Sequence, residues 1–243
     1  QFVRVLRSEE MEPEAVRLAQ VYYYGLVAWL DAQVGRVLDQ LERLRLTDNT
    51  IVIFGADHGA SIGEGGRFQK QTFAREVHRV PRILSWSGHL GEGVARSDLC
   101  ESLDLPRTLC ALLDITARPP FKGRDLLTDS APEAVYATIG YGFDQSRAFP
   151  NLHVGRYADG HGWPRRACVR TARYRLDKNI RLDGLPLPSD QQDRFLVDRA
   201  VDPQESRNLA QDRGHASVLT HLDALLDEQL RDHMEVPPPY VAP

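Results

Sequence analysis

A long helical repeat of apolar residues is the feature that most constrains how this chain can fold. Apolar residues recur every seven positions, with a second line beside the first: Val16, Tyr23, Leu30, Val37 and Leu44, then Val27, Val34 and Leu41. This spacing places them on one face of an α-helix. Pro13 suits the first turn, and the polar run that starts at Thr47 ends the pattern. The sequence therefore predicts a helix from Pro13 to Leu44, about 48 Å long, whose apolar face packs against a core.

A strand is predicted directly after this helix. Ile51 to Phe54 is a run of β-branched and aromatic residues between turn-forming residues, which is typical of a strand covered on both faces in a parallel sheet. A second strand is predicted at Val80–Leu84, where Pro81 favours the start of a strand or an edge position. A helix is predicted from Leu105 to Leu113. This order of elements favours an open α/β sheet.

The pattern of the chain changes after about residue 130. Three strand candidates follow one another without a long helical pattern between them: Val135–Ile139, Ala167–Leu176 and Phe195–Val197. Such spacing favours antiparallel pairing, and Val218–Leu230 reads as an amphipathic helix. We predict an α/β protein with two parts. Residues 1–130 form part of a mixed, mostly parallel sheet covered by helices, and residues 131–243 form a small antiparallel-sheet subdomain with a C-terminal helix.

Composition and charge exclude several classes of protein. The chain has 42% hydrophobic and 26% charged residues, which is ordinary for a globular protein. Thirty basic against 34 acidic residues leave no positive surplus to hold a nucleic acid. No apolar run approaches the ~20 residues that cross a bilayer, so we predict no membrane span. The three cysteines, Cys100, Cys110 and Cys168, lack metal-ligand spacing. The compartment (cytoplasmic, periplasmic or secreted) stays open.

Asp57 and His58 are the first candidate functional residues, because they directly follow the first predicted strand. Ligands of open α/β sheets bind outside the carboxyl ends of the strands. A carboxylate oxygen and an imidazole nitrogen can jointly hold a divalent cation, and Gly59 and Gly63 permit a tight backbone path around it. An Asp-His-Gly tripeptide is also typical of an ordinary turn. On these residues alone, both interpretations stay open.

The wider context of this tripeptide resembles a known family. Residues 57–70 read Asp-His-Gly-x3-Gly-Glu-x5-Lys, followed by Gln71-Thr72-Phe73 and Val80-Pro81. This pattern resembles the C-terminal half of the sulfatase family, within the alkaline phosphatase superfamily. Other segments agree in order along the chain: Leu30-Asp31-x2-Val34-Gly35, Leu46 to Phe54, Asp104-x-Pro106-x-Thr108-Leu109, Val169-Arg170-Thr171-x2-Tyr174-Arg175-Leu176 and Asp202-Pro203-x-Glu205-x2-Asn208-Leu209-Ala210.

The resemblance implies specific roles for three residues. Asp57 and His58 become metal ligands, and Lys70 becomes a catalytic, substrate-binding residue that contacts the sulfate or phosphate oxygens. A cation and an ammonium group would together stabilise charge on the transferred group. Calcium is the favoured ion because sulfatases commonly hold it, and manganese and zinc are alternatives because His58 offers nitrogen. The alternative for Lys70 is a solvated surface lysine.

The nucleophile of the family has no counterpart in these 243 residues. In the family it is a Cys or Ser in Cys/Ser-x-Pro-Ser/Ala-Arg, which is converted to formylglycine. Only Ser130-Ala131-Pro132 places Ser or Cys two residues before a proline, and Glu133-Ala134 follows it. We therefore expect formylglycine and the other metal ligands in a missing N-terminal part, with this N-terminal half as a partner. We also expect the chain alone to be inactive and to expose apolar surface.

These observations predict a metal-dependent hydrolase that cleaves sulfate esters of small-molecule or sugar substrates. A phosphonate or phosphate monoester hydrolase of the same superfamily is the first alternative, because tetrahedral sulfuryl and phosphoryl groups need similar charge clamps. A non-catalytic sulfatase-like protein is the second alternative.

Two further groups of polar residues receive no catalytic role. His153 and His161 lie in the loop-rich stretch 140–164, where histidines are more often structural or solvated. Five arginines are predicted on a solvated face of the second sheet: Arg165, Arg166, Arg170, Arg173 and Arg175.

Overall fold

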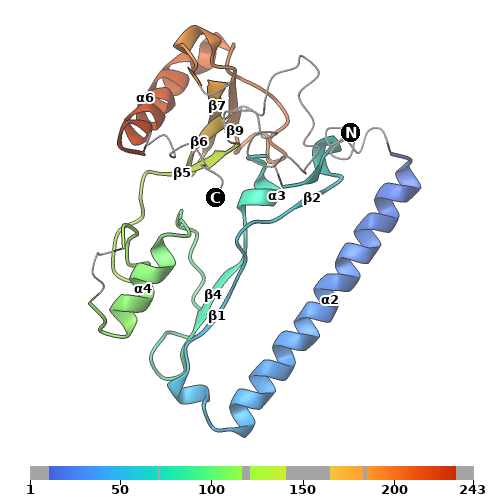
Figure 1. Cartoon of the computed structure of the whole chain (residues 1–243), viewed down its shortest axis with the longest axis vertical. Coiled ribbons are helices and arrows are strands. Elements are labelled where there is room, and N and C mark those ends of the chain that lie inside the picture. Colours follow the sequence, from blue (N-terminus) through green and yellow to red (C-terminus); the bar gives the residue numbers. More distant parts are fainter. Residues whose placement is uncertain (1–10, 71, 117–120, 141–164, 183–184, 234–243) are drawn as a thin grey trace, which may run out of the picture. The chain divides into compact units, whose positions relative to one another are not determined.

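The computed structural model describes residues 11–70, 72–116, 121–140, 165–182 and 185–233 (Figure 1). It divides between Arg96 and Ser97 into two compact units. We call the residues up to Arg96 unit 1 and those from Ser97 onward unit 2. The domain boundary that the sequence predicts at residues 130/131 stays a prediction. His153 and His161 lie outside the described residues.

Unit 1 begins with the long helix that the sequence predicts. Helix α2 runs from Pro13 to Arg43, and Pro at the first helical position suits its start. Arg45, with a φ of 55°, takes the left-handed conformation just after the helix ends. The predicted packing of its apolar face against a core is not found among the described residues. No residue of α2 is buried, and Leu30 and Val37 expose 48% and 62% of their surface.

The rest of unit 1 consists of short strands and helices. Strand β1 (Val52–Gly55) pairs antiparallel with β4 (Arg82–Ser85), and between them lie the hairpin of β2 (Ser61–Ile62) with β3 (Phe68–Gln69) and helix α3 (Arg75–His78). Both strands are thus confirmed. The parallel neighbours that the sequence predicts for β1 are not among the described residues. Most of β1 is therefore half-buried rather than covered on both faces.

Unit 2 contains a helix and a five-stranded sheet. Helix α4 (Asp104–Leu112) confirms the helix predicted at this position. The sheet orders its strands β5-β6-β7-β8, with β9 also paired to β7, and every pairing is antiparallel as predicted. The bounds of the strands are β5 Ala134–Ile139, β6 Arg165–Thr171, β7 Tyr174–Leu182, β8 Leu185–Pro186 and β9 Arg194–Asp198.

One predicted strand of unit 2 is wrong. The stretch Ala167–Leu176 is not a single strand but most of β6, a turn at Ala172 and Arg173, and the start of β7. The Thr171 hydroxyl closes this turn, because it accepts a hydrogen bond of 2.9 Å from the backbone N–H of Tyr174. A side chain thus makes a turn that carries no Gly, Pro, Asn or Asp to mark it.

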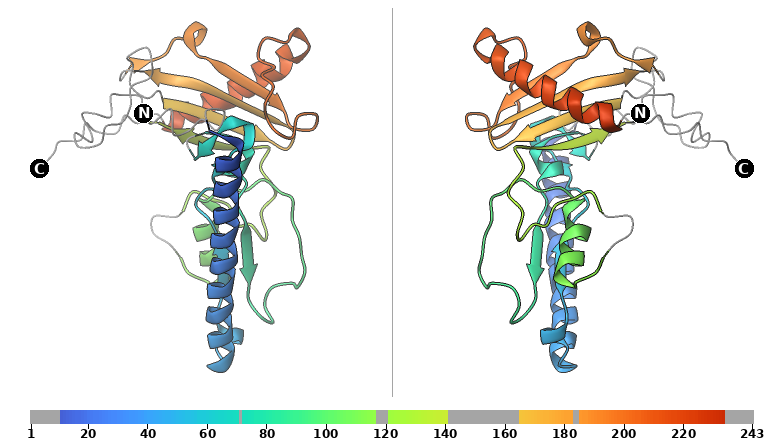
Figure 2. Two further views of the ribbon diagram at one scale, coloured as in Figure 1. Left: turned by 90° about the vertical axis from the view of Figure 1, so that its right-hand side faces the viewer. Right: turned by 90° about the vertical axis from the view of Figure 1, so that its left-hand side faces the viewer.

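Helix α6 (Ala216–His233) gives unit 2 a core, and it lies along one face of the sheet (Figure 2). Its Leu222 and Leu226 are almost fully buried, as are Leu176 and Leu196 of the facing strands. Burying an apolar side chain of this size stabilises a fold by about 1.5–3 kcal/mol. Across both units, no described helix is long and apolar enough to cross a membrane.

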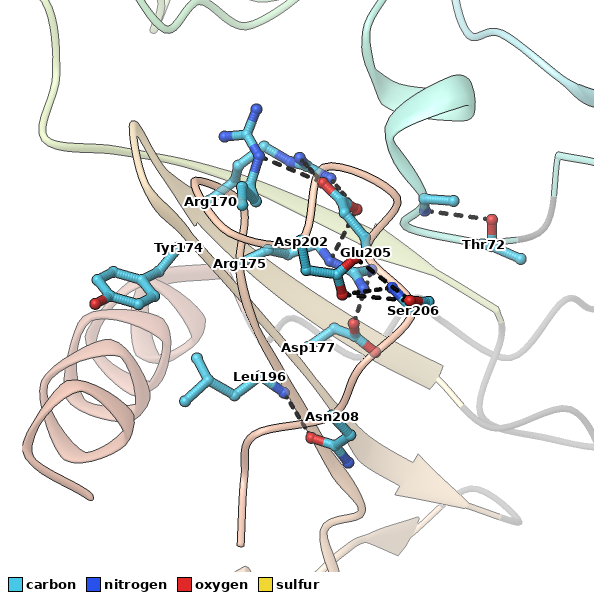
Figure 3. Close-up of polar contacts among 12 residues, drawn as sticks. Thr72, Arg170, Tyr174, Arg175, Asp177, Leu196, Asp202, Glu205, Ser206 and Asn208 are labelled. Atoms are coloured by element: carbon cyan, nitrogen blue, oxygen red, sulfur yellow. Dashed lines mark hydrogen bonds and ion pairs between the residues drawn. The ribbon is translucent and has the colours of Figure 1, made fainter. Parts of the chain in front are cut away.

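Three of the five arginines contradict the predicted solvated face, because Arg166, Arg170 and Arg175 are mostly buried and form ion pairs with carboxylates. Arg173, in the β6–β7 turn, pairs with Asp198 but stays 58% exposed. Figure 3 shows Arg170 and Arg175 with their partners. Arg170 and Arg175 stand opposite each other in the sheet, where like charges repel. The Glu205 carboxylate relieves this repulsion, with its oxygens 2.6 Å from Arg170 Nη1 and 3.2 Å from Arg175 Nε. Arg166 and Arg175 also pair with Asp177. This cluster is therefore a buried structural network.

The motif around Glu205 fastens a loop to this sheet. The Asn208 side chain accepts a hydrogen bond from Leu196 N (3.0 Å) and donates one to Arg194 O (2.9 Å), so it binds the backbone of β9. Asp202 accepts hydrogen bonds from the backbone N–H groups of Ser206 and Arg207, both at 2.8 Å. These contacts explain the spacing of Asp202, Glu205 and Asn208 by structure alone.

Candidate active site

Asp57 is placed at the end of β1, two residues beyond Gly55, where the sequence predicts it. Its side chain is 85% exposed, and its Oδ1 accepts a hydrogen bond of 2.9 Å from the His58 backbone N–H. This hydrogen bond is the largest cause that lowers the pKa of Asp57, the charge of Lys70 lowers it further, and desolvation opposes them. Asp57 is therefore an ionised carboxylate whose second oxygen is accessible to a cation.

The ring of His58 has a defined orientation. Its Nδ1 lies 2.9 Å from the backbone oxygen of Gly59. A carbonyl oxygen only accepts hydrogen bonds, so Nδ1 carries the proton and Nε2 carries the lone pair. This Nε2 lies 3.4 Å from Asp57 Oδ2. A histidine that binds a metal commonly donates its other N–H to a backbone carbonyl in this way, so His58 and Asp57 fit a divalent cation as a pair.

Two glycines make the turn around these residues tight, as the sequence predicts. The Gly59 N–H donates to Val77 O at 2.8 Å, and a Cβ at Gly59 would lie only 2.0 Å from Glu76 O. Gly63 has a φ of +117°, and a Cβ there would lie 2.8 Å from a methyl group of Val16. A side chain at Gly59 would force α3 away from the turn that carries His58.

Lys70 returns to this turn through the β2–β3 hairpin. Ser61 pairs with Gln69 in that hairpin, so the residue after β3 comes back to the start of the loop. The Nζ of Lys70 lies 2.7 Å from His58 Nε2. The structure thus brings together all three residues that the sequence selects. Within the described parts of the chain, no group of three or more His, Cys, Asp or Glu side chains could hold a metal ion.

Two other side chains with reactive groups, Cys168 and His89, make structural contacts. Cys168 is buried in β6, and this burial raises the pKa of its thiol to about 12, so it does not act as a thiolate nucleophile. The His89 ring stacks on Trp86 with 3.9 Å between ring centroids. Sequence reasoning missed the direct contact between His58 and Lys70, because it depends on a hairpin of two-residue strands that leaves no clear periodic pattern.

Comparisons with known proteins point to one family. The sulfatase family model matches residues 12–115. An N-acetylglucosamine-6-O-sulfatase of Bacteroides thetaiotaomicron is 24% identical over 216 residues, which are 89% of this chain and 36% of that protein. An ulvan-active sulfatase of Formosa agariphila is 28% identical over 217 residues, 86% of this chain and 38% of that protein.

A solved structure gives the same fold. The phosphonate monoester hydrolase of Agrobacterium radiobacter has a TM-score of 0.75 and 23% identity, over 93% of this chain and 44% of that one. The chain therefore spans less than half the length of each of these three proteins. The segment matched by the family model contains Asp57, His58 and Lys70. Residues 12–115 of this chain thus match the sulfatase family model, and the chain as a whole is similar to a C-terminal portion of sulfatases.

Proposed function

We propose that this chain is the part of a sulfate-ester hydrolase that holds a divalent cation with Asp57 and His58 and binds the sulfate group with Lys70. The observation that carries the proposal is the meeting of these side chains at the end of β1, with Nζ of Lys70 2.7 Å from His58 Nε2 and Nε2 3.4 Å from Asp57 Oδ2. The two sulfatase relatives act, by their names, on N-acetylglucosamine sulfate and on ulvan. We therefore propose a sulfated sugar or a similar small molecule as the substrate.

Each residue has a distinct task in this proposal. Asp57 supplies a formal negative charge to the cation, and His58 supplies the Nε2 lone pair, oriented by the hydrogen bond of Nδ1 to Gly59 O. Lys70 offers an ammonium group with three N–H donors to the sulfate oxygens. A bound cation would supply further positive charge against the sulfate, and such fixed charges lower the barrier to group transfer. Formylglycine, the proposed nucleophile, would come from an N-terminal part of the protein.

Calcium is the proposed ion. The carboxylates expected in the N-terminal part would give the complete site mostly oxygen ligands, which calcium prefers. Manganese and zinc are the alternatives, because the His58 nitrogen suits them. With calcium, replacing His58 by Asn should preserve binding, since an amide oxygen is also a calcium ligand.

A phosphonate or phosphate monoester hydrolase is the second candidate function. The structural likeness to a phosphonate monoester hydrolase favours it at the level of the fold. The charge clamp formed by Lys70 and a cation also suits phosphoryl oxygens. The two candidates therefore differ in their preferred ester and share the residues of this site.

The test compares two esters on the protein that contains this chain together with its N-terminal part. We expect a larger kcat/KM for 4-nitrophenyl sulfate than for a 4-nitrophenyl phosphonate monoester. Lys70→Ala should lower kcat/KM for the sulfate by about 10²–10³, the range for removing one preorganised donor. The matched control is Lys122→Ala, which changes an exposed lysine of unit 2.

The outcomes of this test separate the three interpretations. A higher kcat/KM for the phosphonate ester would favour the second candidate function. Absence of hydrolysis of both esters by the calcium-loaded protein would favour a non-catalytic sulfatase-like protein. Hydrolysis of the sulfate by the 243-residue chain alone, well above the buffer rate, would show that the nucleophile prediction is wrong.

A further inference from the structure

Lys70 contacts the very atom of His58 that the proposed site assigns to a metal ion. Its Nζ lies 2.7 Å from His58 Nε2, and Nδ1 of the same ring is committed to Gly59 O. A neutral imidazole has one proton-bearing nitrogen and one lone pair. Since that lone pair accepts a hydrogen bond from Lys70, it is not available to a metal ion at the same time.

The Lys70 ammonium group supplies positive charge where a divalent cation would otherwise bind. The Asp57 carboxylate lies 3.4 Å from the same Nε2 that Lys70 contacts at 2.7 Å. The ammonium group thus provides positive charge near the pair that would otherwise hold a divalent cation. An ammonium and a divalent cation at one nitrogen would also repel each other strongly at short range.

We propose that Lys70 is a placeholder cation, which occupies His58 Nε2 until a divalent cation displaces it. The displaced ammonium is then the group that faces the sulfate, because Lys70 directly follows β3 and stays next to the site. This inference rests on the proposed function, since it assumes that Asp57 and His58 bind a metal. It adds an order of events, in which metal binding releases the sulfate-binding lysine.

The placeholder makes a counter-intuitive prediction: removing a side chain of the site should improve metal binding. In Lys70→Met, the Nε2 lone pair is free and no positive charge competes for the Asp57–His58 pair. A single hydrogen bond contributes about 0.5–1.5 kcal/mol, which corresponds to roughly two- to tenfold tighter metal binding. Lys122→Met, which removes an exposed lysine of unit 2, should leave the affinity unchanged.

The experiment follows the His58 ring in the full 243-residue chain by NMR with ¹⁵N-labelled histidine. The His58 signal is assigned by its loss in His58→Asn. In the metal-free chain, Lys70→Met should shift the Nε2 resonance because the hydrogen bond is lost. The chain is then titrated with Mn²⁺, and paramagnetic broadening of this signal reports Mn²⁺ that binds close to His58. We expect the His58 signal of the Lys70→Met variant to lose half of its intensity at a two- to tenfold lower Mn²⁺ concentration than the signal of the parent.

Three outcomes would overturn the inference, and they differ in what else they affect. Equal or weaker Mn²⁺ binding by Lys70→Met would overturn the placeholder while leaving the metal pair of the proposed function intact. An equal gain in Lys122→Met would show a general effect of charge and would also overturn it. A His58 signal that does not respond to Mn²⁺ in any variant would remove both the placeholder and the proposed metal ligand.

Discussion

Units 1 and 2 differ in how much of their apolar surface is buried. Unit 2 carries its own apolar core between α6 and the sheet, with leucines that are at most 1% exposed, and a network of buried ion pairs around Glu205. In unit 1, the 31-residue helix α2 has no buried residue, and the buried apolar side chains among the described residues lie in the short segment Phe73–Val77. The motif that contains Glu205 in unit 2 stabilises the fold, whereas the candidate functional residues lie in unit 1, which has few buried residues.

This contrast bears on what surrounds α2 in a complete protein. Large apolar side chains that stay exposed along a whole helix commonly mark an interaction surface. The exposed apolar surface that the sequence predicts is present on α2, where it includes Leu26, Trp29 and Leu30. We therefore propose that the N-terminal half of the protein covers this helix.

The largest expected effect concerns the buried charges of unit 2. Glu205→Gln should destabilise unit 2 by about 3–5 kcal/mol, because it removes the negative charge between the buried guanidinium groups of Arg170 and Arg175. Hydrogen exchange of the β7 amides measures this loss. Glu228→Gln, on the exposed side of α6, is the control and should change stability little. Equal exchange in the two variants would contradict the structural role of the network.

The second prediction compares leucines of the two units directly. Leu222→Ala should destabilise unit 2 by about 2–4 kcal/mol, because it opens a cavity between α6 and the sheet. Leu30→Ala on α2 should change the stability of the 243-residue chain by about 0.5 kcal/mol or less, because Leu30 is exposed. Urea unfolding followed by circular dichroism measures both. A larger loss for Leu30→Ala would show that α2 is packed in solution.

The third prediction concerns stability at low pH, and its expected effect is smaller. Arg173 donates to Asp198, and this hydrogen bond is the main cause of the lowered pKa of Asp198. A lowered folded-state pKa stabilises the fold above the unfolded value of about 3.9, and this contribution is lost as the pH falls through the folded-state pKa. The Tm should therefore decrease below about pH 4, and less so in Arg173→Gln. Arg213→Gln should retain the full decrease, and an unchanged decrease in Arg173→Gln would contradict this assignment.

The sequence predicts those features whose signal is local. The periodic apolar residues of α2 and α6 define these helices, and the run at Ile51–Phe54 defines β1, because periodicity reports which face of an element is apolar. Periodicity does not report whether a partner covers that face. For this reason the sequence predicts a packed α2, whereas the structure shows an exposed one.

Contacts between distant residues explain the other differences. The sequence predicts Arg170 on a solvated face because its partner Glu205 is 35 residues away in the chain. The sequence does not predict the β6–β7 turn, because the Thr171 side chain closes it. In the candidate site, motif spacing selects Asp57, His58 and Lys70, but only the β2–β3 hairpin shows that Lys70 reaches His58.

Asp57 and His58 are proposed to form a metal-binding pair at the end of β1. The most direct test of this pair is Mn²⁺ binding to the 243-residue chain, measured by electron paramagnetic resonance. We predict that Asp57→Asn weakens binding at least about tenfold, because it removes a formal charge next to the cation. Asp48→Asn, which changes an exposed aspartate of the same unit, should bind like the parent. Equal binding by the parent and by Asp57→Asn would contradict the claim.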